Sequence, residues 1–167
     1  MCLMKKNLLF IVFIIFTVSA SINSYASYEG HEENLGREGP PPAGPYRLGY
    51  KELERAIKTE KKGKIKKAKI KYEKALEYFL KANAENPANA DIFNYLGICS
   101  AKLELNENAE IYYLLGLELD KQHKGIKFNL GTFYLSQNRI NDFKEILTSL
   151  KDCECEEYET LKMLVNK

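Results

Sequence analysis

Small and large apolar residues recur along this chain at helical spacing, and the pattern repeats after 34 residues. With Ala90 as position 1 of a unit, large side chains fall at positions 4, 7 and 24, and small ones at 8, 20 and 27. In that unit these residues are Phe93, Leu96, Tyr113, Gly97, Ala109 and Gly116. Apolar residues three and four apart predict amphipathic helices, and a fixed period predicts stacked copies of one helical hairpin.

The neighbouring windows extend the pattern in both directions. We expect hairpins at about residues 47–89, 90–123 and 124–152, and a last helix at about 155–166 that covers the apolar side of the end unit. Strict spacing would place Gly63 at position 8 of the first unit. We favour an alternative with Gly63 in the turn between helices at about 47–62 and 64–85, which adds about seven residues, or two turns, to the second helix.

The repeat resembles the tetratricopeptide repeat, a pair of antiparallel helices in each 34-residue unit. The segments "FNYLG" and "FNLGTFY" match the start of its first helix, and "ALEYFLKANAENP" and "AEIYYLLGLELD" match its second helix. The resemblance implies an all-α, right-handed α-solenoid of about three repeats with a C-terminal capping helix. The ending "CECEEYETL", with an export signal and a proline-containing leader, is similar to small exported tetratricopeptide proteins of alphaproteobacteria.

In such arrays the first helices line a concave groove, to which positions 2, 5, 9, 12 and 13 contribute side chains. The resemblance therefore implies a set of groove residues in the second and third units: Asp91, Asn94, Ile98, Ala101, Lys102, Gly125, Phe128, Thr132, Leu135 and Ser136. This mixed polar and apolar set suits an extended peptide or a helix of a partner protein, with Phe128 as the expected aromatic anchor. The carboxylate clamp that holds chaperone C-termini has Lys and Asn at positions 5 and 9 of one unit, and it is not matched. Strict spacing of the first unit gives Glu60 and Lys64, and the next units also lack the clamp, with Tyr95 and Asn129 at position 6.

The N-terminus has the layout of a secretory signal peptide. Two lysines precede an apolar run at residues 8–18, and a Ser-Tyr-Ala site ends at Ala26. We expect a signal peptide at 1–26, a disordered Gly- and Pro-rich spacer at 27–46 and a mature protein in the bacterial periplasm. An uncleaved membrane anchor is the alternative.

Charge is balanced over the whole chain but not along it. The 167 residues carry a net charge of +2, while the lysine block at residues 58–74 contains nine lysines against Glu60 and Glu73. Export argues against nucleic acid as a partner. A solvated outer helix face is the simple interpretation of the lysine block, and contact with a membrane surface is the alternative.

The sequence offers little catalytic chemistry. It has two histidines, His31 and His123, and no Gly-rich phosphate loop, metal-ligand spacing or cofactor motif. Cys99 is expected to be a buried, inert thiol. Cys153 and Cys155 are open to three interpretations, a local disulfide, free thiols or a redox pair, and their acidic neighbours disfavour a thiolate.

These observations predict an exported, non-enzymatic scaffold that binds a partner protein or peptide. Two alternatives belong to other classes. One is a thiol-disulfide or metal-handling protein that uses Cys153 and Cys155. The other is an envelope structural protein held at a membrane by an uncleaved N-terminus.

Overall fold

A computed structural model of the chain describes residues 44–165. The expected signal peptide at 1–26 and nearly all of the expected spacer lie outside this range. In the part described, the structure contains seven helices and no strand: α2 (Pro45–Lys61), α3 (Ile65–Glu85), α4 (Ala90–Lys102), α5 (Asn106–Leu119), α6 (Lys124–Ser136), α7 (Ile140–Ser149) and α8 (Glu156–Val165). None of these helices is long and apolar enough to cross a membrane.

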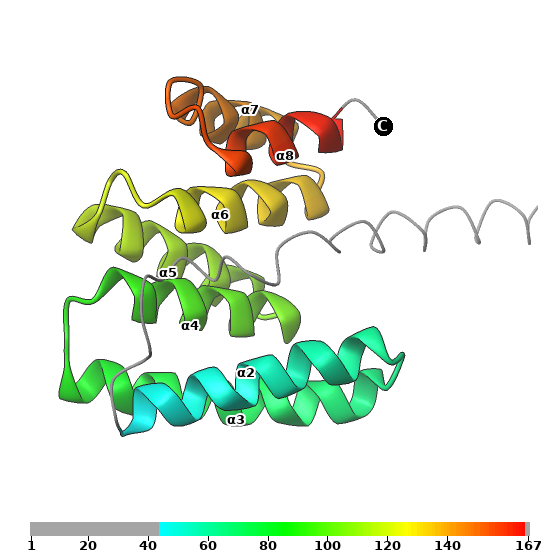
Figure 1. The fold of residues 1–167 in the computed structure, drawn as a ribbon, viewed down its shortest axis with the longest axis vertical. Helices are drawn as coiled ribbons and strands as arrows, with labels where there is room; N and C mark the ends of the chain where they lie inside the picture. The colour runs from blue at the N-terminus through cyan, green and yellow to red at the C-terminus, as the bar shows by residue number, and fades with distance from the viewer. Residues whose placement is uncertain (1–43, 166–167) are drawn as a thin grey trace, which may run out of the picture. The chain divides into compact units, whose positions relative to one another are not determined.

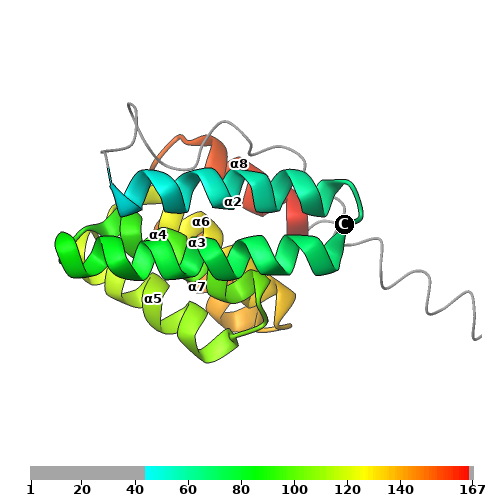
Figure 2. The ribbon, with the colours of Figure 1, turned by 90° about the horizontal axis from the view of Figure 1, so that it is seen from below.

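Consecutive helices pair into hairpins that stack in chain order (Figures 1 and 2). α2 packs on α3, α4 on α5 and α6 on α7, while α2, α4, α6 and α8 also contact one another in series. The helices α4 and α6 begin 34 residues apart, as do α5 and α7. The 34-residue period of the sequence is therefore also the period of the stacked hairpins, and the predicted all-α solenoid is confirmed.

The first hairpin is longer than the second. α2 and α3 have 17 and 21 residues, whereas α4 and α5 have 13 and 14. The turn between α2 and α3 contains Gly63, as in the favoured alternative. The expected boundary at residue 46 is slightly late, because α2 begins at Pro45 and Tyr46 is already buried. Proline is favourable there, since the first turn of a helix does not use its backbone N–H groups.

Close approach within the hairpins depends on glycines that face aromatic rings. A Cβ on Gly97 would lie 2.5 Å from the Tyr113 ring, and a Cβ on Gly49 would lie 2.9 Å from the Phe79 ring. Both rings are buried, so the helices approach until a ring covers the bare backbone. Gly49 is thus the counterpart of Gly97 in the first unit, the role that strict 34-residue spacing gave to Gly63.

The turns inside the three hairpins share one design. Two residues past the end of each first helix stands a residue with positive φ: Gly63 at 70°, Glu104 at 65° and Asn138 at 57°. The next backbone N–H bonds back into the last helical turn, as Leu105 N–H does to Ser100 O at 2.9 Å and Arg139 N–H to Tyr134 O at 2.9 Å. This is the Schellman arrangement, which satisfies carbonyls that the helix end leaves open.

α8 closes the array. Leu161 on this helix is completely buried, and its Cδ1 lies 3.1 Å from the position of a Cβ on Gly131. In the first two units, the space beside the first-helix glycine is filled by an aromatic ring from the second helix of the same hairpin. In the third unit, Leu161 of the capping helix fills part of the equivalent space. The expected capping helix at 155–166 agrees with Glu156–Val165 as far as the described residues extend.

Candidate functional site

The first helices of the three hairpins, α2, α4 and α6, present one shared surface, which we call the first-helix face (Figure 1). The groove residues expected from the sequence all belong to α4 and α6. The structure shows that several of them are engaged within the protein.

Asp91 is joined to the next repeat through His123. The His123 ring caps α6, because its Nδ1 accepts a hydrogen bond from the Ile126 backbone N–H at 3.1 Å. A ring nitrogen that accepts carries no proton, so in the neutral ring Nε2 donates to Asp91 Oδ1 at 3.1 Å. Asp91 is 27% exposed in this pair and therefore retains a face toward solvent.

Asn94 pairs with Asn129 across α4 and α6. Asn129 Nδ2 donates to Asn94 Oδ1 at 2.8 Å, which links two repeats by an amide pair. Asn94 is completely buried, and its own Nδ2 has no hydrogen-bond partner in the described part of the protein. The site therefore contains a buried amide donor without an acceptor.

Lys102 is held by the long first hairpin. Its Nζ lies 3.0 Å from Glu60 Oε1, and the other Glu60 oxygen accepts from the Tyr72 hydroxyl. The Lys102 side chain is 23% exposed in this contact. Because its charge is compensated by Glu60, Lys102 is poorly suited to be a clamp for a partner's carboxylate.

Two expected groove side chains are buried. Phe128 is only 3% exposed and Ile98 is 9% exposed. The expectation that Phe128 is an exposed anchor outside the core is therefore wrong: the structure places its ring in the interior. Thr132 and Leu135, on the following turns of α6, are half-buried and remain at the surface. Thr132 Oγ1 donates to the Asn129 carbonyl at 2.9 Å, as helical threonines often do.

An aromatic cluster that the sequence reasoning missed lies beneath the first-helix face at α2: Tyr46, Phe79 and Tyr95 are buried, and Tyr50 is half-buried at the edge. Tyr46 and Tyr50 both lie edge-on to Tyr95, with ring centroids 5.8 Å apart, and Phe79 stacks on Tyr95 at 5.0 Å. Burial and the neighbouring Tyr46 raise the pKa of Tyr95 well above its usual value. A partial signal is the dipeptide Leu-Gly, which occurs in all three first helices, at residues 48–49, 96–97 and 130–131, and also elsewhere, at 35–36 and 115–116. Alignment on the first-helix copies places Tyr46 and Tyr50 in the positions of Asn94 and Ile98.

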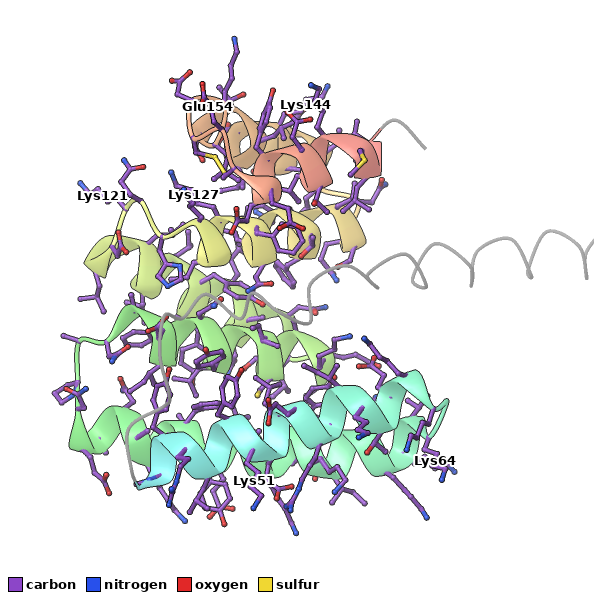
Figure 3. All side chains as sticks on the ribbon, viewed as in Figure 1. Lys51, Lys64, Lys121, Lys127, Lys144 and Glu154 are labelled. Atoms are coloured by element: carbon purple, nitrogen blue, oxygen red, sulfur yellow. A yellow bond between two sulfur atoms is a disulfide. The ribbon has the colours of Figure 1, made fainter. Side chains whose placement is uncertain are left out.

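The two C-terminal cysteines form a disulfide. Cys153 and Cys155 are bonded in the loop between α7 and α8, with Cα atoms 5.1 Å apart (Figure 3). Cys99 is a free, completely buried thiol, and its burial raises its pKa far above the range in which it would ionise at neutral pH. Among the described residues, no group of His, Cys, Asp and Glu is arranged to hold a metal ion.

The charged side chains of the first-helix face therefore interact mostly with other groups of the protein. Asp91 and Lys102 have partners within the protein, and the buried Lys127 on α6 donates to the Ser149 carbonyl at 3.1 Å. Positions 5 and 9 of the first unit, counted from Gly49, hold Tyr46 and Tyr50 rather than the Lys and Asn of a carboxylate clamp. Apolar contact and amide hydrogen bonds are the chemistry that this surface offers.

Stacked helical hairpins of 34 residues, with glycine-to-ring contacts and a capping helix, define a tetratricopeptide-repeat solenoid. No protein-family model matches the sequence, and no curated protein matches it. Solved structures do match. The second tetratricopeptide domain of human RPAP3, solved with the HSP70 peptide SGPTIEEVD, is 23% identical and aligns 74% of this chain with 99% of that domain at a TM-score of 0.53.

Two further structures show the same fold. The Arabidopsis OM64 tetratricopeptide domain is 17% identical, with 74% of this chain and 98% of that chain aligned at a TM-score of 0.54. The first tetratricopeptide domain of human RPAP3 is 16% identical, with 74% and 95% aligned at 0.52. The chain therefore has the tetratricopeptide-repeat fold.

Proposed function

We propose that the first-helix face binds a segment of a partner protein, and that the protein is a scaffold without catalytic activity. The fold supports this proposal, because solenoids of this kind present an extended surface built from successive first helices. The internal pairing of Asp91 and Lys102 supports recognition by shape and hydrogen bonding rather than by a charged clamp.

The observation that carries the proposal is the half-buried surface of Thr132 and Leu135 on α6. Neither side chain takes part in the charge pairs that engage Asp91 and Lys102 within the protein. Thr132 bonds to the Asn129 carbonyl, and the amide pair of Asn129 and the buried Asn94 holds α6 against α4, so the protein itself keeps this part of the first-helix face in place.

Site-specific photo-crosslinking tests the proposal. A benzophenone side chain at Leu135 should capture a partner in the native host, whereas the same group at the exposed Glu145 of α7 should not. Replacing Thr132 by Arg in the Leu135 background should reduce the yield, since a bulky side chain would occupy the surface beside Leu135. Equal capture from both positions, or no capture from Leu135, would contradict the proposal.

We further propose that the protein is exported to the periplasm and begins at Ser27 after cleavage. The supporting observation inside the described region is the Cys153–Cys155 disulfide, because such bonds persist mainly in oxidising compartments. N-terminal sequencing of the native protein should find Ser27 in the soluble envelope fraction. Met1 on a membrane pellet would contradict export with cleavage and would support the anchored structural alternative.

The same disulfide favours one second candidate function, thiol-disulfide exchange. Cys155 is 9% exposed, while Cys153 is half-buried and accessible to a small reagent. Glu154 and Glu156 flank Cys155 and would destabilise a thiolate there. Catalysed reduction of a small aromatic disulfide by added dithiothreitol, which first reduces the Cys153–Cys155 bond and supplies the electrons, should be lost in Cys153→Ser if this activity exists. A wild-type rate equal to that of dithiothreitol alone would exclude it.

A further inference from the structure

The extra length of the first hairpin forms a projecting tip at one end of the first-helix face, beyond the helices α4 and α6. The turn between α2 and α3 extends beyond the ends of α4 and α5 in two perpendicular views (Figures 1 and 2). We call residues 58–67 the hairpin tip. Packing does not explain its extension, because a Cβ on Gly63 at the turn would meet nothing within 4 Å.

The tip is strongly basic. It contains six lysines and one acidic residue, Glu60, within ten positions. All six lysines are exposed, and Figure 3 shows Lys64 directed outward at the end of the hairpin. Both carboxylate oxygens of the one acidic residue, Glu60, bond to side chains outside the tip, those of Lys102 and Tyr72. Several positive charges therefore gather on a convex end.

An aliphatic side chain lies in the middle of these charges. Ile65, the first residue of α3, is 51% exposed and is flanked by Lys64 and Lys66. An exposed isoleucine is unremarkable by itself, but this one lies beside the turn of the first hairpin, where a membrane surface in contact with the lysines would also meet it. Lysines around an apolar side chain are the pattern that binds the surface of an anionic bilayer.

We propose that the hairpin tip binds anionic phospholipid surfaces, with the lysines on the headgroups and Ile65 in the interfacial region. The convex shape favours a flat, deformable surface, and lysines rather than arginines form point contacts to phosphate. No aromatic side chain occurs within the tip to stack on bases, which disfavours single-stranded nucleic acid. Contact through the tip leaves the α6 part of the first-helix face, with Thr132 and Leu135, open for a partner.

Vesicle binding of the full chain tests the proposal. The probes are phosphatidylcholine vesicles with and without phosphatidylglycerol, at low and high salt. The hydrophobic N-terminus is common to every arm, so the difference between the two vesicle types is the readout. We expect the quadruple variant Lys58→Gln, Lys62→Gln, Lys64→Gln, Lys67→Gln to lose at least about tenfold in affinity for anionic vesicles.

The matched control removes four exposed lysines elsewhere, Lys121, Lys124, Lys144 and Lys151. It should bind anionic vesicles as the wild type does, and raised salt should weaken binding of the wild type because the charges are screened. Equal binding by both quadruple variants would overturn the proposal. Tighter binding to a single-stranded oligonucleotide than to the vesicles would assign the tip to nucleic acid instead.

A fluorescent reporter tests the apolar contact separately. The chain contains no tryptophan, so Ile65→Trp introduces a unique fluorophore. Its emission should shift to the blue with anionic vesicles and not with neutral ones. Ile111→Trp on α5, where the native side chain is 54% exposed, is the control and should not shift. A blue shift at residue 111 but not at residue 65 would show that another surface contacts the lipid.

Discussion

The ring of Tyr113 occupies the space that a side chain on Gly97 would need, with Cε1 only 2.5 Å from the position of a Cβ. The contact joins α4 to α5 inside the second hairpin, and both residues are buried. Gly49 and Phe79 repeat the relationship in the first hairpin. The glycine and the ring therefore pack as one unit, and the effects of substituting them on the free energy of unfolding should not be additive.

Gly97→Ala should destabilise the protein by roughly 1–3 kcal/mol, because the added methyl group overpacks the contact. In an unpacked helix the same change would stabilise by about 0.5–1 kcal/mol, so the sign alone distinguishes packing from helix propensity. Chemical denaturation provides the measurement. Combination with Tyr113→Leu should recover part of the loss, and strictly additive effects of the two substitutions would contradict the proposed contact.

Phe128→Ala should cost about 3–5 kcal/mol, as expected for removal of a large buried side chain. Leu135→Ala, two turns later on the same helix at a half-buried position, should cost much less. Thermal unfolding of both variants checks the burial of Phe128. A melting temperature for Phe128→Ala equal to that of the wild type would show that the Phe128 side chain is exposed.

His123→Ala should remove both the cap of α6 and the bond to Asp91, at a cost of about 1–2 kcal/mol. His123→Asn should keep most of the stability, since an asparagine side chain caps well but is too short to reach Asp91. A double-mutant cycle with Asp91→Ala separates the two contributions. If alanine and asparagine are equally destabilising, the cap is not the source of the effect.

Glu110 should make stability depend on acid pH. A hydrogen bond from Arg139 holds the pKa of this carboxyl below its ordinary value of 4.5. A lowered folded-state pKa adds stability above the unfolded value, and that stability is lost as the pH falls through the lowered pKa. The melting-temperature difference between the wild type and Glu110→Gln should therefore be full near about pH 7 and fade below about pH 4. Glu145→Gln, on the exposed side of α7, serves as the control.

Glu104 occupies a backbone conformation that suits glycine or asparagine, the residues found at the equivalent turns as Gly63 and Asn138. Glu104→Gly should stabilise the protein by about 0.5–1 kcal/mol, since a left-handed conformation is strained for other residues. The substitution also removes the exposed ion pair with Lys69, which is worth little. Lys69→Gln measures that loss by itself, and a destabilised Glu104→Gly with a neutral Lys69→Gln would contradict the argument.

Much of the fold could be predicted from the sequence because its signals are local and periodic. The 34-residue spacing of small and large residues gave the second and third hairpins, and Gly63 marked the turn of the first. Gly49 was missed because the longer helices of the first hairpin shift it out of the period. The Leu-Gly dipeptide would have made Gly49 a candidate, although the same dipeptide also occurs at residues 35–36 and 115–116, outside the first helices.

The surface was harder to predict than the core. A position rule places Phe128 on the first-helix face, but whether its ring is covered depends on long-range packing that spacing does not encode. The partners of Asp91 and Lys102 come from residues 32 and 42 positions away, His123 and Glu60. Pairings at that separation depend on how the hairpins stack, so they cannot be predicted from the sequence of a single hairpin.

The contact of Leu161 with the backbone at Gly131 has a consequence for how this protein could be lengthened by gene duplication. The second unit, residues 90–123, carries its own ring against its own glycine, so an inserted copy would bring a complete internal contact. A copy of residues 124–152 would arrive without the leucine that belongs to the terminal helix. New modules therefore fit in the middle of the array, while its last hairpin and terminal helix move only as one piece.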